Sequence, residues 1–228
     1  MIKKLYTLFK LGRKLAKSDA LKIATRFNEP PLLVKVLFSI LSFSFTNNKK
    51  VGSSLNQGER LSASLQTMGT TFIKLGQFLA TRPDIIGDEL SKELENLQDK
   101  LPPFSQEKAK EIIRKDLGDQ SFNSIINLSE PIAAASIAQV HKAQINDDGT
   151  IKDVAIKILR PDIKKIFNEE IDALMLFAFF VESFVKKTKR LKLVEVVFLL
   201  KEITNLEMDL RFEAAAANEY GENTKNDE

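Results

Sequence analysis

The chain has 228 residues, 43% of them hydrophobic and 29% charged, which suits a globular protein of one domain or one and a half. It has no cysteine, which excludes disulfides and thiolate metal sites and favours a reducing compartment, and its single histidine argues against a histidine-based metal site or a Ser-His-Asp triad. The net charge is +3, yet residues 1–60 hold twelve Lys and Arg against three Asp and Glu, an excess that favours an anionic partner such as lipid headgroups.

Residues 2–27 are predicted to form a basic amphipathic helix, because the apolar residues fall near one face and the lysines lie largely elsewhere. Three interpretations stay open: a helix on a membrane surface, a solvated helix packed on its own domain, and a transit peptide. No stretch reaches the about 20 apolar residues needed to span a bilayer, and the segment lacks the long apolar region of a secretory signal.

The following segments are predicted to be helical as far as residue 117. Proline pairs bound them, because proline cannot continue a helix, and leucines recur at helical spacing up to Leu101. Ser105 is a predicted N-cap and Gly118 a predicted C′ residue of the last helix. The helices are predicted at residues 32–45, 59–79, 83–101 and 106–117, with a polar loop at residues 47–58.

From Phe122 onward, short apolar runs separated by turn signals predict a small antiparallel sheet. The run Asn146-Asp147-Asp148-Gly149 is typical of a hairpin turn. His141 falls in the middle strand and is interpreted as structural, because no motif surrounds it. The strands are predicted at residues 125–128, 137–145 and 152–159, and two further helices at residues 161–187 and 192–219.

This order of elements predicts an α+β fold. The predicted domains are residues 1–58, with basic and hydrophobic helices, residues 59–120, a helical extension, and residues 121–228, the sheet and its helices.

Lys157 ends the run Val154-Ala155-Ile156-Lys157, in which apolar residues precede a lysine on a predicted strand. A lysine in this position extends its ammonium across the sheet edge, where it can pair with nucleotide phosphates and with a helix glutamate. The alternative is an ordinary lysine on a half-exposed strand. The position of Lys157, after a hairpin and before helices, favours the nucleotide interpretation.

Small residues occupy the predicted connection between the first two strands, namely Ala133, Ala134, Ala135 and Ser136. Their backbone N–H groups and the Ser136 hydroxyl can bind phosphate oxygens, but the loop lacks glycines, which reach positive φ without steric cost. A nucleotide-binding loop of altered shape is therefore predicted. A plain bend of small residues between two strands stays open as the alternative.

A closely spaced group of carboxylates lies on the predicted helix 192–219, namely Glu207, Asp209 and Glu213. Asp209 and Glu213 are four residues apart and share a face, where like charges cost about 0.2–0.5 kcal/mol. A cation between them, either Lys157 or a metal ion, would remove that cost. For Glu207 the alternative is an ordinary surface pair with Arg211.

The segment Lys74-Leu75-Gly76-Gln77 lies on a predicted helix and places Lys74 and Gln77 on one face. A glycine inside a helix costs about 1 kcal/mol relative to alanine, so Gly76 is expected to have a packing or functional reason.

These motifs together resemble the UbiB family of atypical kinase-like proteins, which is linked to ubiquinone biosynthesis. The match runs from about Leu61 to the end of the chain. Its motifs are Thr71-Phe72-Ile73-Lys74-Leu75-Gly76-Gln77-Phe78 with Thr81-Arg82-Pro83-Asp84, the segments Pro131–Val140 and Val154–Lys157, and Glu207-Met208-Asp209 with Glu213.

The resemblance implies a protein-kinase-like N-lobe, a small antiparallel sheet plus an αC-like helix, with an N-terminal helical extension. Lys157 would be the nucleotide-phosphate lysine, paired with Glu213 of the αC-like helix. The alanine-rich loop would shift the nucleotide preference and disfavour protein phosphorylation, and the expected nucleotide is ATP or ADP. Lys74 and Gln77 would lie over the active site against Glu207 and Asp209 and occlude the groove in which a kinase binds its peptide substrate.

The sequence departs from the kinase pattern because it contains no His-Arg-Asp-like catalytic loop and no Asp-Phe-Gly motif. The C-lobe and the C-terminal transmembrane segments of bacterial family members are therefore expected to be absent, and Mg²⁺ is expected only in a full-length protein. The chain is interpreted as the N-terminal part of a UbiB protein, either a fragment or a broken gene, and is expected to be inactive by itself.

The expected function of the whole protein is an atypical kinase or ATPase that supports ubiquinone biosynthesis, including the polyprenylphenol hydroxylation stage. The alternative is a non-catalytic helical module that binds membranes or partners. Expected partners are anionic membrane lipids and ubiquinone-biosynthesis proteins, with a peripheral location on the cytoplasmic face of the bacterial inner membrane. Nucleic acid is not expected, because no nucleic-acid-binding module is recognised and tryptophan is absent.

Overall fold

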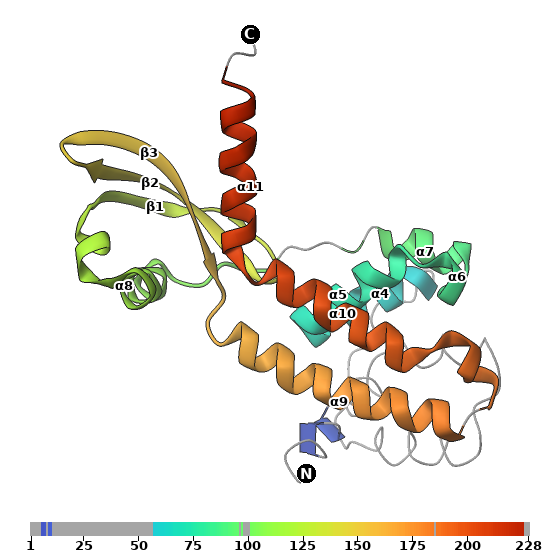
Figure 1. Ribbon diagram of the computed structural model, residues 1–228. Helices are drawn as coiled ribbons and strands as arrows, with labels where there is room; N and C mark the ends of the chain where they lie inside the picture. Colours follow the sequence, from blue (N-terminus) through green and yellow to red (C-terminus); the bar gives the residue numbers. More distant parts are fainter. Residues whose placement is uncertain are drawn as a thin grey trace. The chain divides into compact units, whose positions relative to one another are not determined.

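The computed structural model describes residues 6, 7, 9, 10, 57–95, 97, 101–184 and 186–225 (Figure 1). The four residues near the N-terminus are helical, and the rest of the predicted helices 2–27 and 32–45 lies outside the described residues. None of the described helices combines the length and the apolar character that crossing a bilayer requires.

Contacts divide the chain into two compact units. One unit comprises residues 1–98 and 165–204, and the other comprises residues 99–164 and 205–228. The second unit contains the sheet together with the helix at residues 106–123, a helix that the sequence assigns to the preceding helical extension.

The helices of the first unit are shorter than predicted, because two glycines interrupt them. The predicted helix 59–79 is wrong as a single element, since Gly69 has a φ of 106° and separates α4 (Gln57–Met68) from α5 (Thr70–Ala80). Gly87, with a φ of 85°, likewise separates α6 (Pro83–Ile86) from α7 (Asp88–Glu95), and Leu97 lies beyond the helix. Glycine adopts this left-handed backbone without the clash that a Cβ would cause.

The core of these short helices is apolar and closely packed. Phe72 and Ile73 of α5 are fully buried, at 1% and 0% exposure, and so is Leu94 of α7, at 1%. Gly76 of α5 is also buried, and a Cβ built on it would come within 2.5 Å of Leu97 and 2.8 Å of Leu65. This contact confirms the predicted packing reason for a glycine inside the helix.

The second unit contains α8 (Gln106–Asn123), whose predicted start is confirmed and which breaks at Gly118, where the predicted helix 106–117 ends. The Ser105 side chain accepts a hydrogen bond from the backbone N–H of Lys108 and caps the helix. Gly118, with a φ of 81°, breaks the regular helix where the C′ residue is predicted, and a short helical turn follows as far as Asn123.

The three predicted strands form one antiparallel sheet in the order β1-β2-β3. They are β1 (Ile125–Ala134), β2 (Ala138–Asp147) and β3 (Thr150–Leu159). Asp148 and Gly149 have φ values of 50° and 88° and make the predicted hairpin turn between β2 and β3. β1 extends past the predicted end at Leu128, because an edge strand accommodates Pro131 through irregularities in its register.

The two faces of the sheet have different surroundings. Figure 1 shows α8 along one face, where Ile158 of β3 packs with Ala109 and Ile113 of α8 in a buried core. Ile156 packs against the same core. Because side chains alternate along a strand, Ala155 and Lys157 belong to the opposite face.

A helical excursion follows β3, as predicted, but with one additional break. It consists of α9 (Ile163–Phe184), the 3₁₀ turn η1 (Lys186–Leu191), α10 (Leu193–Glu207) and α11 (Leu210–Asn223). The predicted single helix 192–219 is wrong because Asp209 leaves the helical conformation, with a φ of −99° and a ψ of 86°, and caps α11. Met208, beside it, is buried at 2% exposure.

Candidate functional site

Lys157 of β3 and Glu213 of α11 form an ion pair on the sheet face opposite α8. The Lys157 Nζ lies 2.8 Å from Oε1 and 2.6 Å from Oε2 of Glu213, although the two residues are 56 positions apart in the sequence. The Lys157 side chain is 35% exposed and the Glu213 side chain is 57% exposed. An ammonium carries three N–H donors, so Lys157 can bind a second anion while it contacts Glu213.

The alanine-rich segment lies where the sequence predicts it, at the connection from β1 to β2. Ala133 and Ala134 end β1, and Ala135 with Ser136 lead into β2. The backbone N–H of Ala135 donates to the carbonyl of Ala138 at 2.8 Å and closes a tight bend. Ala133 is exposed, whereas Ser136 is fully buried at 0% exposure, so the Ser136 hydroxyl would reach a nucleotide only after a rearrangement.

Arg160, directly after β3, holds this bend in place. Its Nε and Nη2 donate to the carbonyl of Ala135 at 2.9 and 2.8 Å, and its backbone N–H donates to the carbonyl of Ile137 at 2.9 Å. Nη1 and Nη2 also donate to the carbonyls of Pro102 and Leu101, at 3.0 and 3.2 Å. Arg160 therefore connects the alanine-rich segment to the chain that precedes α8.

The carboxylates predicted on one helix have separate surroundings. Asp209 accepts hydrogen bonds from the backbone N–H, Nε and Nη2 of Arg211, at 3.3, 2.7 and 2.5 Å. The side-chain hydrogen bond from Arg211 is the main reason that the pKa of Asp209 falls from 3.8 to about 2. Glu207 ends α10 and Arg211 belongs to α11, so these two residues do not share one helix, and the surface pair between them stays a prediction.

Lys74 and Gln77 lie on α5, in the first unit, and are both half-buried. Glu207 and Asp209 belong to the second unit. The predicted position of Lys74 and Gln77 against these carboxylates stays a prediction, as do the catalytic roles of all four residues.

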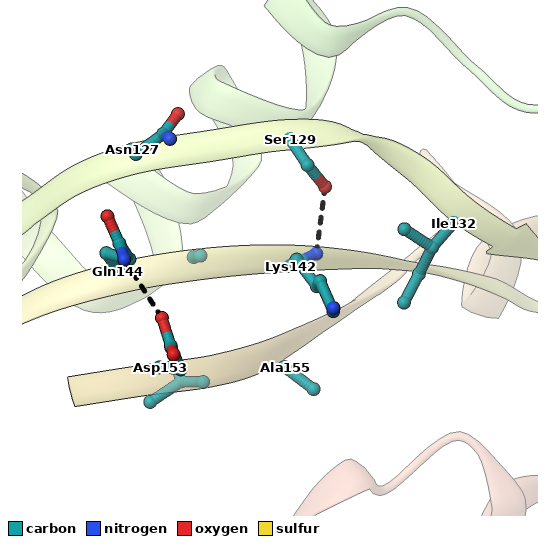
Figure 2. A pocket seen from close by; sticks show the side chains of 9 residues that line it. Asn127, Ser129, Ile132, Lys142, Gln144, Asp153 and Ala155 are labelled. Atoms are coloured by element: carbon teal, nitrogen blue, oxygen red, sulfur yellow. Dashed lines mark hydrogen bonds between the residues drawn. The ribbon is translucent and has the colours of Figure 1, made fainter.

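A cavity of about 500 Å³ occupies the same sheet face as Lys157 (Figure 2). Lys142 of β2 and Ala155 of β3 are paired in register, and Ile132 of β1 lines the same cavity. Gln144 donates to Asp153 at 3.1 Å further along these two strands. The cavity thus offers apolar surface at Ile132 and Ala155 and a cationic side chain at Lys142. Its lining residues are Asn127, Ser129, Ile132, Lys142, Ala143, Gln144, Asp153, Val154 and Ala155.

His141 of β2 has the structural role that the sequence suggests. It is fully buried at 0% exposure, and its Nδ1 donates to the carbonyl of Ser129 at 2.7 Å. Its Nε2 accepts from the amide of Gln139 at 2.9 Å, and the Oε1 of Gln139 accepts from the backbone N–H of Phe104 at 2.9 Å. Both ring nitrogens are therefore used inside the fold. Within the described part of the chain, no group of three or more His, Asp or Glu side chains could hold a metal ion.

Sequence reasoning did not single out Arg160 or Gln139. Both contact backbone groups of residues 101–104, which are more than thirty positions away, so no local pattern marks these contacts. The one available signal is the polar residue itself: an arginine directly after an apolar strand and directly before Pro161.

Comparison with known proteins agrees with the resemblance seen in the motifs. A family model of the ABC1 atypical kinase-like domain matches residues 96–228. Among curated relatives, the "Probable protein kinase UbiB" of Marinobacter nauticus is 35% identical over 200 residues, which are 87% of this chain and 35% of the relative. The protein of the same name from Aliivibrio fischeri (strain MJ11) is 33% identical over 228 residues, or 100% of this chain and 40% of the relative.

The chain spans 35% and 40% of the length of these two relatives. The family match covers more than half of the chain and includes the sheet, Lys157 and Glu213. The chain therefore belongs to the ABC1 atypical kinase-like family, with UbiB proteins among its relatives.

Proposed function

We propose that this chain is part of a UbiB-type atypical kinase or ATPase that binds ATP or ADP on the sheet face carrying Lys157. The ion pair between Lys157 of β3 and Glu213 of α11 is the observation that carries the proposal. Protein kinases use a β3 lysine paired with a helix glutamate to hold the nucleotide phosphates. The whole protein would support ubiquinone biosynthesis, including the hydroxylation of polyprenylphenol intermediates, together with other ubiquinone-biosynthesis proteins.

In this proposal the nucleotide lies along the open face of the sheet. Lys157 binds the phosphates with the N–H that Glu213 leaves available. Backbone N–H groups of the alanine-rich loop contact the phosphate oxygens, apart from that of Ala135, which donates to the carbonyl of Ala138. The base lies over Ile132 and Ala155 in the cavity, where apolar surface favours a flat ring. Mg²⁺ would accompany ATP in the whole protein, but the described residues offer no acidic cluster for it, so no metal step is assigned to them.

The alanine-rich loop accounts for the difference from a protein kinase. Alanine avoids the positive φ values that glycine reaches, so Ala133, Ala134 and Ala135 restrict how the loop closes over the terminal phosphate. Lys74, Gln77, Glu207 and Asp209 would occlude the groove for a peptide substrate. Nucleotide hydrolysis then replaces protein phosphorylation as the proposed reaction.

A titration with a fluorescent ATP analogue tests the nucleotide site. Lys157→Ala should weaken binding by about tenfold or more, because the phosphates lose their cationic contact. Lys152→Ala is the matched control: this lysine of the same strand pairs with Asp147 beside the hairpin turn. Equal affinities of the wild-type chain and Lys157→Ala would contradict the assignment of Lys157.

A second candidate function, binding to an anionic membrane surface, is supported by the end of α9. Phe179, Phe180 and Phe184 are exposed at 58%, 45% and 77%, and the rings of Phe180 and Phe184 stack with centroids 6.2 Å apart. Residues 186–192 follow directly and contain five Lys and Arg and no acidic residue. Exposed aromatic rings beside a basic segment are typical of contact with anionic lipid headgroups. We propose a peripheral location on the cytoplasmic face of the bacterial inner membrane.

Flotation with vesicles tests this surface. The wild-type chain should float with vesicles that contain phosphatidylglycerol, and the double variant Phe180→Ser and Phe184→Ser should float less, because two buried contacts with the lipid are lost. Phe212→Ser, on α11, is the control, since Phe212 is also exposed at 62% but lies outside the α9 cluster. Equal flotation of the double variant would contradict the role of α9. A self-associating wild-type chain that does not float would assign the cluster to contacts between copies.

A further inference from the structure

We infer that Arg160 is a positioning residue that fixes the shape of the alanine-rich loop and thereby sets the affinity for a nucleoside di- or triphosphate. The part of this inference that concerns affinity rests on the proposed nucleotide function, whereas the part that concerns the loop does not. Arg160 is outside the motifs that support the family resemblance. The positioning role is inferred from the hydrogen bonds that Arg160 makes.

Two donors of the Arg160 guanidinium bind the carbonyl oxygen of Ala135. Nε and Nη2 both donate to the oxygen of Ala135, at 2.9 and 2.8 Å. The backbone N–H of Arg160 donates to the carbonyl of Ile137, two residues further along the same bend. Three hydrogen bonds from one residue thus determine the direction of the peptide units at the connection from β1 to β2.

The same guanidinium is itself held by a rigid segment. Its Nη1 and Nη2 donate to the carbonyls of Pro102 and Leu101, at 3.0 and 3.2 Å. Proline has no N–H and a fixed φ, so Pro102-Pro103 is stiff, and its carbonyls are available as acceptors. Gln139 fixes the next residues, since its amide contacts both the N–H and the carbonyl of Phe104, at 2.9 and 3.2 Å.

A loop that is held in this way differs physically from a glycine-rich loop. A glycine-rich loop becomes ordered when the nucleotide binds, and the loss of conformational freedom weakens the affinity. Here the Ala135 carbonyl is already oriented, so the backbone N–H groups of the loop are arranged before the phosphates arrive. Arg160 supplies this arrangement indirectly, by holding the loop, and its guanidinium is engaged with carbonyls.

Hydrogen exchange measured by mass spectrometry on Arg160→Gln tests the loop. Peptides that cover residues 133–138 should exchange about tenfold faster than in the wild-type chain, because the bend opens more often once its carbonyl is released. Peptides that cover the hairpin at residues 144–153 should keep the wild-type rate and report that the sheet remains folded. Arg114→Gln, which removes the same charge from α8, is the matched control and should leave the loop unchanged.

Nucleotide affinity is then measured on the same proteins with a fluorescent ADP analogue. Arg160→Gln should weaken binding by about tenfold, and Arg114→Gln should not. Arg160→Lys keeps the positive charge but lacks the planar fork, so it should also show a fast-exchanging loop and weakened binding. Full recovery with lysine would overturn the positioning role and assign the effect to charge alone.

Loop exchange tests the role of Arg160, and nucleotide binding tests the proposed function, so the failure of one can be distinguished from the failure of the other. Wild-type loop exchange in both Arg160→Gln and Arg160→Lys would overturn the inference. A wild-type chain that binds no nucleotide would contradict the proposed function, while the exchange rates of the loop would still decide whether Arg160 holds it. If Arg160→Gln unfolds the whole unit, as fast exchange of residues 144–153 would show, Arg160→Lys provides the decisive comparison.

Discussion

The carboxylate of Asp209 begins α11 and determines how the helix that carries Glu213 starts. It accepts hydrogen bonds from the backbone N–H and from the guanidinium of Arg211, which lower its pKa to about 2. Glu213 lies one turn further along α11 and contacts Lys157. Asp209 and Glu213 therefore have a cation each, Arg211 and Lys157, rather than one between them. The start of α11 at Asp209 positions Glu213 for its contact with β3.

Because Asp209 caps α11 as an ionised carboxylate, the loss of folding stability caused by Asp209→Ala should depend on pH. Because the pKa is lowered in the folded state, the carboxylate stabilises the fold above its ordinary pKa of 3.8, and this contribution is lost as the pH falls through about 2. Asp209→Ala should lower the free energy of unfolding at pH 7, and its difference from the wild-type chain should shrink between about pH 4 and pH 2.

Urea unfolding followed by circular dichroism measures this difference. Asp209→Asn is the control, because asparagine keeps a capping oxygen without the charge and should lose less stability at pH 7 than alanine does. A deficit in Asp209→Ala that is the same at pH 2 and pH 7 would contradict the role of the ionised carboxylate.

At the scale of elements, helix α5 shows why a residue with poor helix propensity is retained. Gly76 removes the side chain where α5 approaches Leu65 of α4 and Leu97, both 5% exposed. The two leucines are side-chain neighbours in a core that also holds Phe72 and Ile73. The motif Lys74-Leu75-Gly76-Gln77 therefore has a packing requirement at its glycine, independent of any role of Lys74 and Gln77.

Because Gly76 is closely packed and Gly221 is not, replacing each glycine with alanine should change the free energy of unfolding differently. Gly76→Ala should lower the free energy of unfolding by about 1 kcal/mol, because overpacking costs about 1–3 kcal/mol and alanine returns about 1 kcal/mol of helix propensity. Gly221→Ala in α11, where a Cβ would meet nothing within 4 Å, should be neutral or stabilising. Urea denaturation of both variants checks the prediction, and a stabilising Gly76→Ala would contradict the close packing of α5.

At the scale of the whole molecule, charge is distributed unevenly while the total stays small. The net charge is +3, but basic residues are concentrated among residues 1–60 and again among residues 186–192. Exposed aromatic rings accompany the second basic segment at Phe179, Phe180 and Phe184. In the proposed membrane role, such a distribution would attract the protein to a negatively charged surface without making it strongly cationic overall.

This distribution predicts that vesicle binding depends on salt. Flotation with anionic vesicles should fall strongly between about 0.1 M and 1 M salt, because the Debye length shortens from about 10 Å to about 3 Å. Vesicles of phosphatidylcholine alone should bind weakly at both salt concentrations. Binding that persists at 1 M salt on anionic and neutral vesicles alike would show that aromatic insertion, rather than charge, is the main attraction.

Local patterns in the sequence determined the elements on which the candidate site is built. The short apolar run before it placed Lys157 on a strand, the turn Asp148-Gly149 defined the hairpin, and Ser105 marked the start of α8. These features depend on neighbours a few residues apart, whose steric and hydrogen-bonding preferences can be read directly. The same applies to Gly76, whose cost in a helix signalled a packing reason.

Contacts between distant groups depend on the packing of the whole fold. Glu213 of α11 reaches Lys157 across 56 positions, and Arg160 reaches Leu101, which precedes α8, across 59. No local signal encodes either proximity. The breaks at Gly69 and Asp209 also escaped sequence reasoning, since apolar periodicity continues through both residues while the backbone turns. Local preferences of the chain therefore place Lys157 on its strand, whereas the packing of distant elements supplies the partners that orient it.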